Sequence, residues 1–139
     1  MKARIKWIED RNFLGESASG HAVVMGSMGG KTGVAIAPTP MEMILMGLGG
    51  CTSYDVVHIL ERGREAITDC QVEIDADRAT EDPKVFTKIH LHFVLTGRNL
   101  NPAKVERAIA LSAEKYCSAS AMLAKAAPIT HDFEVIEAA

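Results

Sequence analysis

The sequence has few cysteines and no excess of basic charge, and each shortage excludes a class of protein. Fifteen basic residues against eighteen acidic ones give a net charge of −3, so bulk charge offers nucleic acid no attraction and no nucleic-acid partner is expected. Three cysteines cannot all pair within one chain, and no C-x₂-C spacing is present; this argues against a disulfide scaffold and against a cysteine zinc site. The composition, 47% hydrophobic and 24% charged, is typical of an ordered globular protein.

Long uninterrupted apolar runs, linkers and repeats are also missing. No apolar run approaches the roughly 18 residues of a membrane span, and residues 1–4 lead into a strand-like segment rather than a signal peptide. We therefore expect a cytoplasmic protein with no membrane partner. Nothing in the composition divides the 139 residues, which predicts a single domain over residues 1–139 with a substantial core.

The spacing of the apolar residues predicts an α+β fold. Alternation at period two predicts strands, and spacings of three and four predict helices. The strands are expected at residues 2–8, 12–15, 21–25, 70–77, 85–95 and 129–136, and the helices at 39–63, 101–116 and 118–126. The first strand should be half-buried, and 70–77 should form a hairpin with 85–95. The mixed order βββ-α-ββ-α-α-β indicates α+β rather than a parallel βαβ fold.

The predicted helix over 39–63 has a well-defined start. Thr39 is a good N-cap, Pro40 suits the first helical position, and Glu42 three residues after the cap completes a capping box. The helix is apolar nearly all round, which predicts a central, buried position. Three glycines in its interior indicate that something packs very closely there: Gly47, Gly49 and Gly50.

Several polar residues have both a structural and a functional interpretation. The capping box favours a structural role for Glu42 over a catalytic carboxylate. His90 and His92 lie on one face of a strand, but a metal site needs at least one more ligand, so we expect a solvated face and no metal. The spacing of the Gly26–Thr32 loop does not fit a phosphate-binding loop, and no cofactor is expected.

The three cysteines occupy different contexts. Cys51 follows two glycines inside the apolar helix, Cys117 lies at the junction of the second and third helices, and Cys70 lies at the edge of a strand. A lone buried cysteine is usually a small, inert hydrophobic residue, and this interpretation suits Cys70. For Cys51 and Cys117, spacing alone leaves both a structural and a redox role open.

The residues around both cysteines resemble a known family. The stretch TPMEMILMGLGGC, with Pro40 eleven residues before Cys51, resembles the first cysteine helix of the OsmC/Ohr family of osmotically induced and organic-hydroperoxide-resistance proteins. The stretch AEKYCSASAML around Cys117 resembles the second motif, and Trp7 fits the N-terminal strand. The similarity covers essentially the whole chain and is closest to the YhfA-like branch.

This resemblance implies an architecture and a reaction. The architecture is an intertwined homodimer with two long central helices and strands from both chains around them. The reaction is that of a thiol-dependent peroxidase, in which the Cys51 thiolate attacks a hydroperoxide, preferably organic, and becomes a sulfenic acid. Cys117 then condenses with it to a disulfide, which a dithiol reductant of the lipoyl or thioredoxin type reopens. The family context is oxidative-stress defence.

Two positions depart from the family pattern and define an alternative. The family's glutamate directly follows the proline, where this sequence has Met41. The family also has an activating arginine after the first strand, where this sequence has Phe13. The candidates for activation are therefore Arg11, the nearest arginine, and Glu42, which lies one residue beyond Met41 and about 100° further round the helix. The substitution at Met41 supports the alternative of a catalytically weak or inactive stress-associated module that binds an apolar ligand in the dimer cleft.

Overall fold

The computed structural model describes all 139 residues, which fold as two compact units. The first unit comprises residues 1–46 and the second residues 47–139. Helix α1 (Pro40–Arg62) begins in the first unit and continues through the second. Strands occur in both units. The helices lie between strands in the sequence, with α1 after β3 and the other helices after β5, so the α+β fold class is confirmed.

The first unit is a small antiparallel sheet. Its strands β1 (Ala3–Glu9), β2 (Asn12–Ser17) and β3 (Ala22–Met25) pair in sequence order. The prediction that the first strand is half-buried is wrong for this chain, because every residue of β1 is exposed. Alternation marks which face of a strand is apolar, but it carries no information about whether the same chain covers that face.

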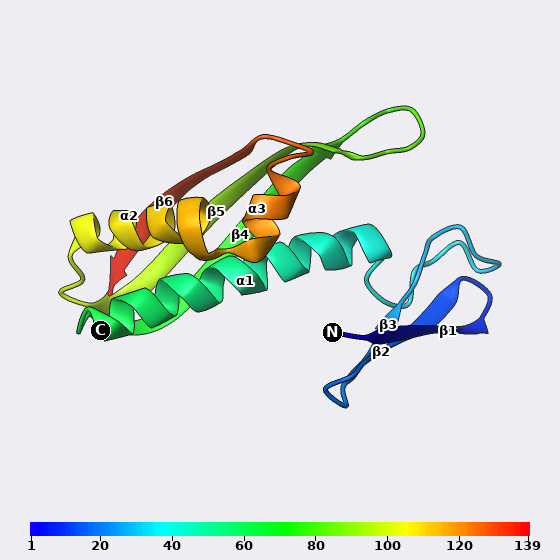
Figure 1. Cartoon of the computed structure of the whole chain (residues 1–139), viewed down its shortest axis with the longest axis horizontal. Coiled ribbons are helices and arrows are strands. Elements are labelled where there is room, and N and C mark those ends of the chain that lie inside the picture. Colours follow the sequence, from blue (N-terminus) through cyan, green and yellow to red (C-terminus); the bar gives the residue numbers. More distant parts are fainter. The chain divides into compact units, whose positions relative to one another are not determined.

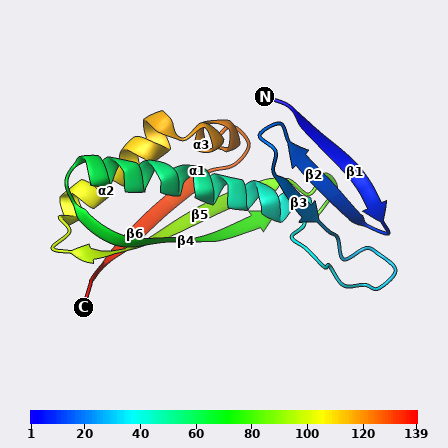
Figure 2. The ribbon, with the colours of Figure 1, turned by 90° about the horizontal axis from the view of Figure 1, so that it is seen from below.

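The second unit is a three-stranded sheet with helices on one side (Figures 1 and 2). Strand β4 (Ala66–Arg78) pairs antiparallel with β5 (Phe86–Arg98), which confirms the predicted hairpin. Strand β6 (Ile129–Glu137) pairs with β5 in parallel. The parallel pairing follows from the connection, because α2 (Pro102–Leu111), a π-helical turn (Ser112–Tyr116) and α3 (Ser118–Leu123) carry the chain back to the start of β5.

The core lies between the helices and β5. The side chains with the least exposure come from α1, β5 and α2 and include Leu48, Val56, Leu60, Ile89, Phe93, Leu95, Val105 and Ile109. These positions recur at helical spacing in α1 and α2 and at alternate positions in β5, as their elements require. The outer face of the same sheet carries the polar residues of β4 and β5, such as Glu73, Lys88 and His92.

Helix α1 is less enclosed than predicted. Its buried residues form one stripe (Leu48, Gly49, Thr52, Val56 and Leu60), whereas Ile44, Met46 and Tyr54 are exposed. Within a single chain α1 is therefore only partly buried, so the predicted burial is wrong at this level. Its central place between two chains stays a prediction. Of the three glycines, only Gly49 lies against a side chain: a Cβ atom added there would lie 2.9 Å from Ile74 Cδ1, whereas one added at Gly47 or Gly50 would meet open space.

Helix α1 is also the one helix with the length and composition to cross a bilayer. The sequence contains no uninterrupted apolar run of that length, but α1 qualifies when its few polar residues are included. The core helices of globular proteins share these properties.

The second predicted helix, 101–116, is divided in the structure. Asn101 caps α2 by accepting a hydrogen bond from the Ala103 N–H at 2.9 Å, but the α-helix ends at Leu111. A π-helical turn over Ser112–Tyr116 follows, closed by a 2.9 Å bond from the Cys117 N–H to the Ser112 carbonyl. Apolar spacing continues through this turn, which is why the sequence pattern does not reveal it.

Candidate active site

The site is built where α1 meets the π-helical turn, and it brings two cysteines together. Cys51 lies about three turns into α1 and is partly exposed, whereas Cys117 follows the π-helical turn and is 2% exposed. The Cys51 thiol is close enough to Cys117 to raise the pKa of the Cys117 thiol. Both cysteines are free. Two thiols that lie far apart in the sequence are thus neighbours in the fold.

Cys117 is held by the start of α3. As the N-cap of that helix, its sulfur accepts a hydrogen bond from the Ser120 N–H at 3.3 Å. Burial raises the pKa of the Cys117 thiol; the Ser120 contacts oppose this rise and the adjacent Cys51 adds to it. Because the thiolate is the reactive form, the raised pKa makes Cys117 a poor first target for an oxidant. Cys51 is the more accessible of the two sulfurs.

Two cavities lie beside this site. One of about 90 Å³ is enclosed by α1, β5 and the segment after α2, and its lining includes Thr52, Phe93 and Ser120. A more open one of about 490 Å³ is lined by Asp55, His58, Ile59, Arg62, Leu111 and Tyr116. The site region therefore combines a small buried space with a larger, partly charged opening.

Cys70 lies in a different environment from Cys51 and Cys117. It lies half-buried on β4, where burial raises the pKa of its thiol, Ser53 opposes the rise and Asp69 adds to it. It lines a pocket of about 370 Å³ with Gly50, Ser53, Tyr54, Val57, His58 and Glu61. Cys70 thus lies on the helix-facing side of the sheet, and the structural role expected for it stays a prediction.

Glu42 makes the capping box predicted for it. The Thr39 N–H donates to Glu42 Oε1 at 3.0 Å, and the Glu42 N–H donates to Thr39 Oγ1 at 3.2 Å. These bonds to Thr39 lower the pKa of the Glu42 carboxyl group. The carboxylate is thus engaged at the helix start. Arg11 lies in the turn between β1 and β2, in the first unit, and its activating role stays a prediction.

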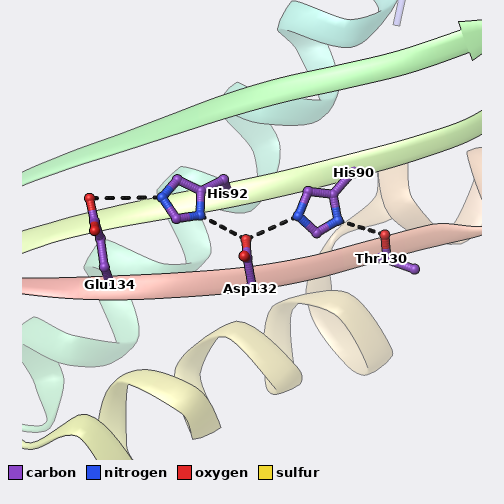
Figure 3. A network of polar contacts seen from close by, with 5 residues as sticks. All are labelled: His90, His92, Thr130, Asp132 and Glu134. Atoms are coloured by element: carbon purple, nitrogen blue, oxygen red, sulfur yellow. Dashed lines mark hydrogen bonds and ion pairs between the residues drawn. The ribbon is translucent and has the colours of Figure 1, made fainter.

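His90 and His92 are bound to acidic and hydroxyl side chains of β6 (Figure 3). His90 Nε2 lies 3.0 Å and His92 Nδ1 2.7 Å from the same oxygen, Asp132 Oδ1. His90 Nδ1 lies 2.7 Å from Thr130 Oγ1, and His92 Nε2 lies 3.8 Å from Glu134 Oε1. No set of three His, Cys, Asp or Glu residues is arranged to hold a metal ion. The pair forms a polar network on the outer face of the sheet.

Sequence reasoning missed three polar residues beside the cysteines: Thr52, Asp55 and Ser112. Thr52 and Ser112 fall at the spacing of the apolar positions of their helices, and Asp55 belongs to no motif. Thr52 Oγ1 lies 2.9 Å from Ser112 Oγ, which donates to Asp55 Oδ2 at 2.9 Å. A signal was present, because hydroxyl residues within two apolar stripes must find partners when both stripes are buried.

Comparison with known proteins establishes the family. The profile described as OsmC-like protein matches residues 29–132. The chain belongs to the OsmC-like family. It is 54% identical to protein YhfA of Escherichia coli strain K12 over 139 residues, covering 99% of this chain and 100% of that protein. The resemblance to the YhfA-like branch is thus confirmed.

Solved structures agree with this placement. A structure from structural genomics, 51% identical, covers 99% of this chain and 100% of its own with a TM-score of 0.90. A hypothetical protein from Aquifex aeolicus, 26% identical, has a TM-score of 0.86 and covers 99% and 97% of the two chains. The organic hydroperoxide resistance protein OhrB of Bacillus subtilis, 14% identical, has a TM-score of 0.65 and coverage of 96% and 98%. At that identity the likeness shows the fold alone.

Proposed function

We propose that this protein is a thiol-dependent peroxidase that reduces organic hydroperoxides in oxidative-stress defence. The observation that carries the proposal is the pairing of a partly exposed thiol, Cys51, with an adjacent buried thiol, Cys117. A peroxidase of this kind needs one sulfur that meets the oxidant and a second that captures the product before it is oxidised further. The shared fold with a protein named for organic hydroperoxide resistance is consistent with this role.

The reaction has three balanced steps. The Cys51 thiolate attacks the distal oxygen of the hydroperoxide; the O–O bond breaks, and protonation of the leaving alkoxide gives an alcohol and a Cys51 sulfenic acid. The Cys117 sulfur then attacks the sulfenic sulfur, forming the disulfide and releasing water. A dithiol reductant of the lipoyl or thioredoxin type transfers two electrons and two protons, which restores both thiols. A cytoplasmic location, where reducing dithiols are available, belongs to this proposal.

We also propose that the working form is an intertwined homodimer. Apolar side chains of β1, β3 and α1 are exposed in the single chain, among them Ile5, Trp7, Val23, Ile44 and Met46. An exposed apolar set of this kind is typical of a surface that a partner covers. The two long central helices of the expected architecture are then α1 of each chain.

The peroxidase proposal is tested by substituting each cysteine separately. Cys51→Ser abolishes turnover of cumene hydroperoxide, whereas Cys117→Ser leaves a single oxidation followed by over-oxidation of Cys51, read by mass spectrometry of the intact protein. Cys70→Ser is the matched control and keeps full turnover. The proposal fails if the reduced wild-type protein forms no Cys51–Cys117 disulfide with one equivalent of cumene hydroperoxide.

A second candidate function is a catalytically weak or inactive module that binds an apolar ligand in the dimer cleft. The observation that favours it is the engagement of the Glu42 carboxylate at the start of α1, with Met41 at the position where the family has its glutamate. This candidate predicts binding of a fluorescent fatty acid by the reduced protein, together with no loss of cumene hydroperoxide. Binding without turnover selects the module, and turnover without binding selects the peroxidase.

A further inference from the structure

A buried chain of hydroxyl groups connects α1 to the π-helical turn. Ser112 is fully buried and Thr52 is 2% exposed, and they are joined by the 2.9 Å contact between their oxygens. The Asp55 carboxylate can only accept a hydrogen bond, so Ser112 uses its one hydroxyl proton on Asp55. Thr52 must then donate to Ser112. The chain therefore has a fixed direction, from Thr52 through Ser112 to Asp55.

The residues of this hydroxyl chain are connected through the backbone to both cysteines. Thr52 follows Cys51 directly, and Asp55 lies one helical turn after Cys51 on the same face of α1. On the other side, the Ser112 carbonyl accepts the 2.9 Å bond from the Cys117 N–H that closes the π-helical turn. Ser112 thus holds α1 with its side chain and Cys117 with its backbone.

The π-helical bonding to the Ser112 carbonyl determines the direction in which the Cys117 side chain points. In a π-helical turn the N–H bonds to the carbonyl five residues earlier, whereas in an α-helix it bonds to the carbonyl four residues earlier. If the turn relaxed to α-helical bonding, each residue after it would shift by about 100° around the axis. The Cys117 sulfur would then turn away from its present direction, and its partner on α1 would not follow.

We propose that Asp55 and Ser112 are positioning residues that hold the π-helical turn so that the Cys117 sulfur faces Cys51. This inference rests on the proposed function for its place in the reaction. It concerns one step, in which the Cys117 sulfur attacks the Cys51 sulfenic sulfur, the S–S bond forms, the S–O bond breaks, and the hydroxide leaves as water with the thiol proton. The attack of Cys51 on the hydroperoxide does not involve the turn.

The test separates these two steps by stopped-flow mixing with cumene hydroperoxide, followed by acid quench, thiol alkylation and mass spectrometry. In Asp55→Ala and Ser112→Ala, hydroperoxide consumption in the first turnover stays within about twofold of the wild type, and disulfide closure slows by roughly tenfold to a hundredfold. Asp55→Asn retains an oxygen that accepts from Ser112 and restores closure. Thr52→Val removes the other side-chain contact of Ser112 and should slow closure less than Asp55→Ala does. Cys70→Ser, which lies outside the hydroxyl chain, is the control, with closure as in the wild type.

A second measurement needs no hydroperoxide. In glutathione buffers, two protein thiols exchange with glutathione disulfide to give the Cys51–Cys117 disulfide and two glutathione molecules. Asp55→Ala and Ser112→Ala require about a tenfold higher ratio of glutathione disulfide to the square of glutathione for half-oxidation, because their sulfurs meet less often. If the wild type forms the disulfide here but not with hydroperoxide, the proposed function fails and the positioning role still stands.

Three results would overturn the positioning role. The first is a half-oxidation ratio that is equal in Asp55→Ala, Ser112→Ala and the wild type. The second is a parallel loss of first-turnover consumption and closure in Asp55→Ala, which would indicate a general effect on folding. The third is a closure rate in Asp55→Asn as slow as in Asp55→Ala. Circular dichroism melts accompany each variant, and if Ser112→Ala does not fold, the comparison of Asp55→Ala with Asp55→Asn decides.

Discussion

The two three-stranded sheets of this protein both carry large apolar side chains, but these side chains differ in their exposure to water. In the second unit, Ile89, Leu91, Phe93 and Leu95 of β5 are buried beneath the helices that the same chain supplies. In the first unit, the matching apolar residues of β1 and β3 are exposed, with Trp7 at 62% and Val23 at 47%. The difference lies in what each unit supplies: helices of the second unit cover the apolar face of its sheet, and the first unit buries few of its own apolar side chains.

This difference shows what a single chain leaves incomplete. Three strands with an apolar face are stable when that face packs against something, and a large exposed apolar face in a soluble protein is usually covered by a partner. The proposed homodimer would cover both the exposed apolar face of the first sheet and the exposed apolar side of α1. The following predictions test the contrast between the two sheets.

The largest expected effect is in the covered sheet. Phe93 is 1% exposed in the centre of β5, and Phe93→Ala removes a buried ring and leaves a cavity. We expect a loss of about 3–5 kcal/mol in the free energy of unfolding, measured by urea denaturation. Phe93→Leu keeps most of the volume and is expected to lose about 1 kcal/mol. Equal losses for the two variants would contradict a tightly packed β5.

The next effect concerns the uncovered sheet. Sedimentation equilibrium is expected to give twice the chain mass of 15.0 kDa for the wild type. Trp7→Ala should weaken association by about 2 kcal/mol, because large aromatic side chains dominate interfaces. Lys6→Ala, on the opposite face of the same strand, is the control and should leave the mass unchanged. A wild-type mass of one chain would mean that no partner covers β1.

A smaller effect compares two glycines of α1. Gly50 meets no heavy atom within 4 Å of an added Cβ, whereas Gly49 would meet Ile74 Cδ1 at 2.9 Å. Gly50→Ala is therefore expected to raise the free energy of unfolding by roughly 0.5–1 kcal/mol through helix propensity. Gly49→Ala should not show this gain. Thermal melts of the two variants make the measurement, and a loss in Gly50→Ala would show that a second chain packs at that position.

The smallest effect lies on the outer face of the second sheet, where Asp132 raises the pKa of His92 and His92 lowers the pKa of Asp132. The raised His92 pKa contributes stability below the ordinary histidine value of 6.5, and this is lost as the pH rises through the folded-state pKa. The lowered Asp132 pKa contributes above the ordinary value of 3.8, and this is lost as the pH falls through its folded-state pKa. The pair therefore contributes most between these two ordinary values.

The measurement is an NMR titration of the His92 ring. We expect Asp132→Asn to lower the His92 pKa and to flatten the dependence of stability on pH near neutrality. Thr130→Ala, which removes only a partner of His90, is the control and should leave His92 unchanged. An unchanged His92 pKa in Asp132→Asn would show that the ion pair between His92 and Asp132 does not form in solution.

The element order was predictable because its signals are local. The capping box at Thr39 and Glu42, the alternation of β5 and the Asn101 cap of α2 each depend on residues within one turn or strand. The parallel pairing of β6, the exposure of β1 and the π-helical turn depend on contacts between distant segments. Spacing along the chain carries no record of those contacts.

The residues of the candidate site also fall into two groups: those that a local sequence motif identifies and those that depend on contacts between distant segments. Cys51 and Cys117 were identified because the residues around them resemble a family motif, and their adjacency could not follow from spacing. Asp55 was missed because it belongs to no motif, and Ser112 was missed because it falls at the spacing of the apolar positions of its helix. Their partnership depends on α1 and the π-helical turn meeting in the folded chain, at the 2.9 Å bond between them.

The parallel pairing of β5 and β6 places Cys117 within the crossover that connects these strands. A covalent bond from there back to α1 would close a ring that contains both long strands and α2. Closing a loop of this size stabilises a folded domain by about 4 kcal/mol, so the oxidised protein would resist heat and proteases better than the reduced one. Each turnover would then raise and lower the stability of the second unit, and the melting temperature would report the redox state.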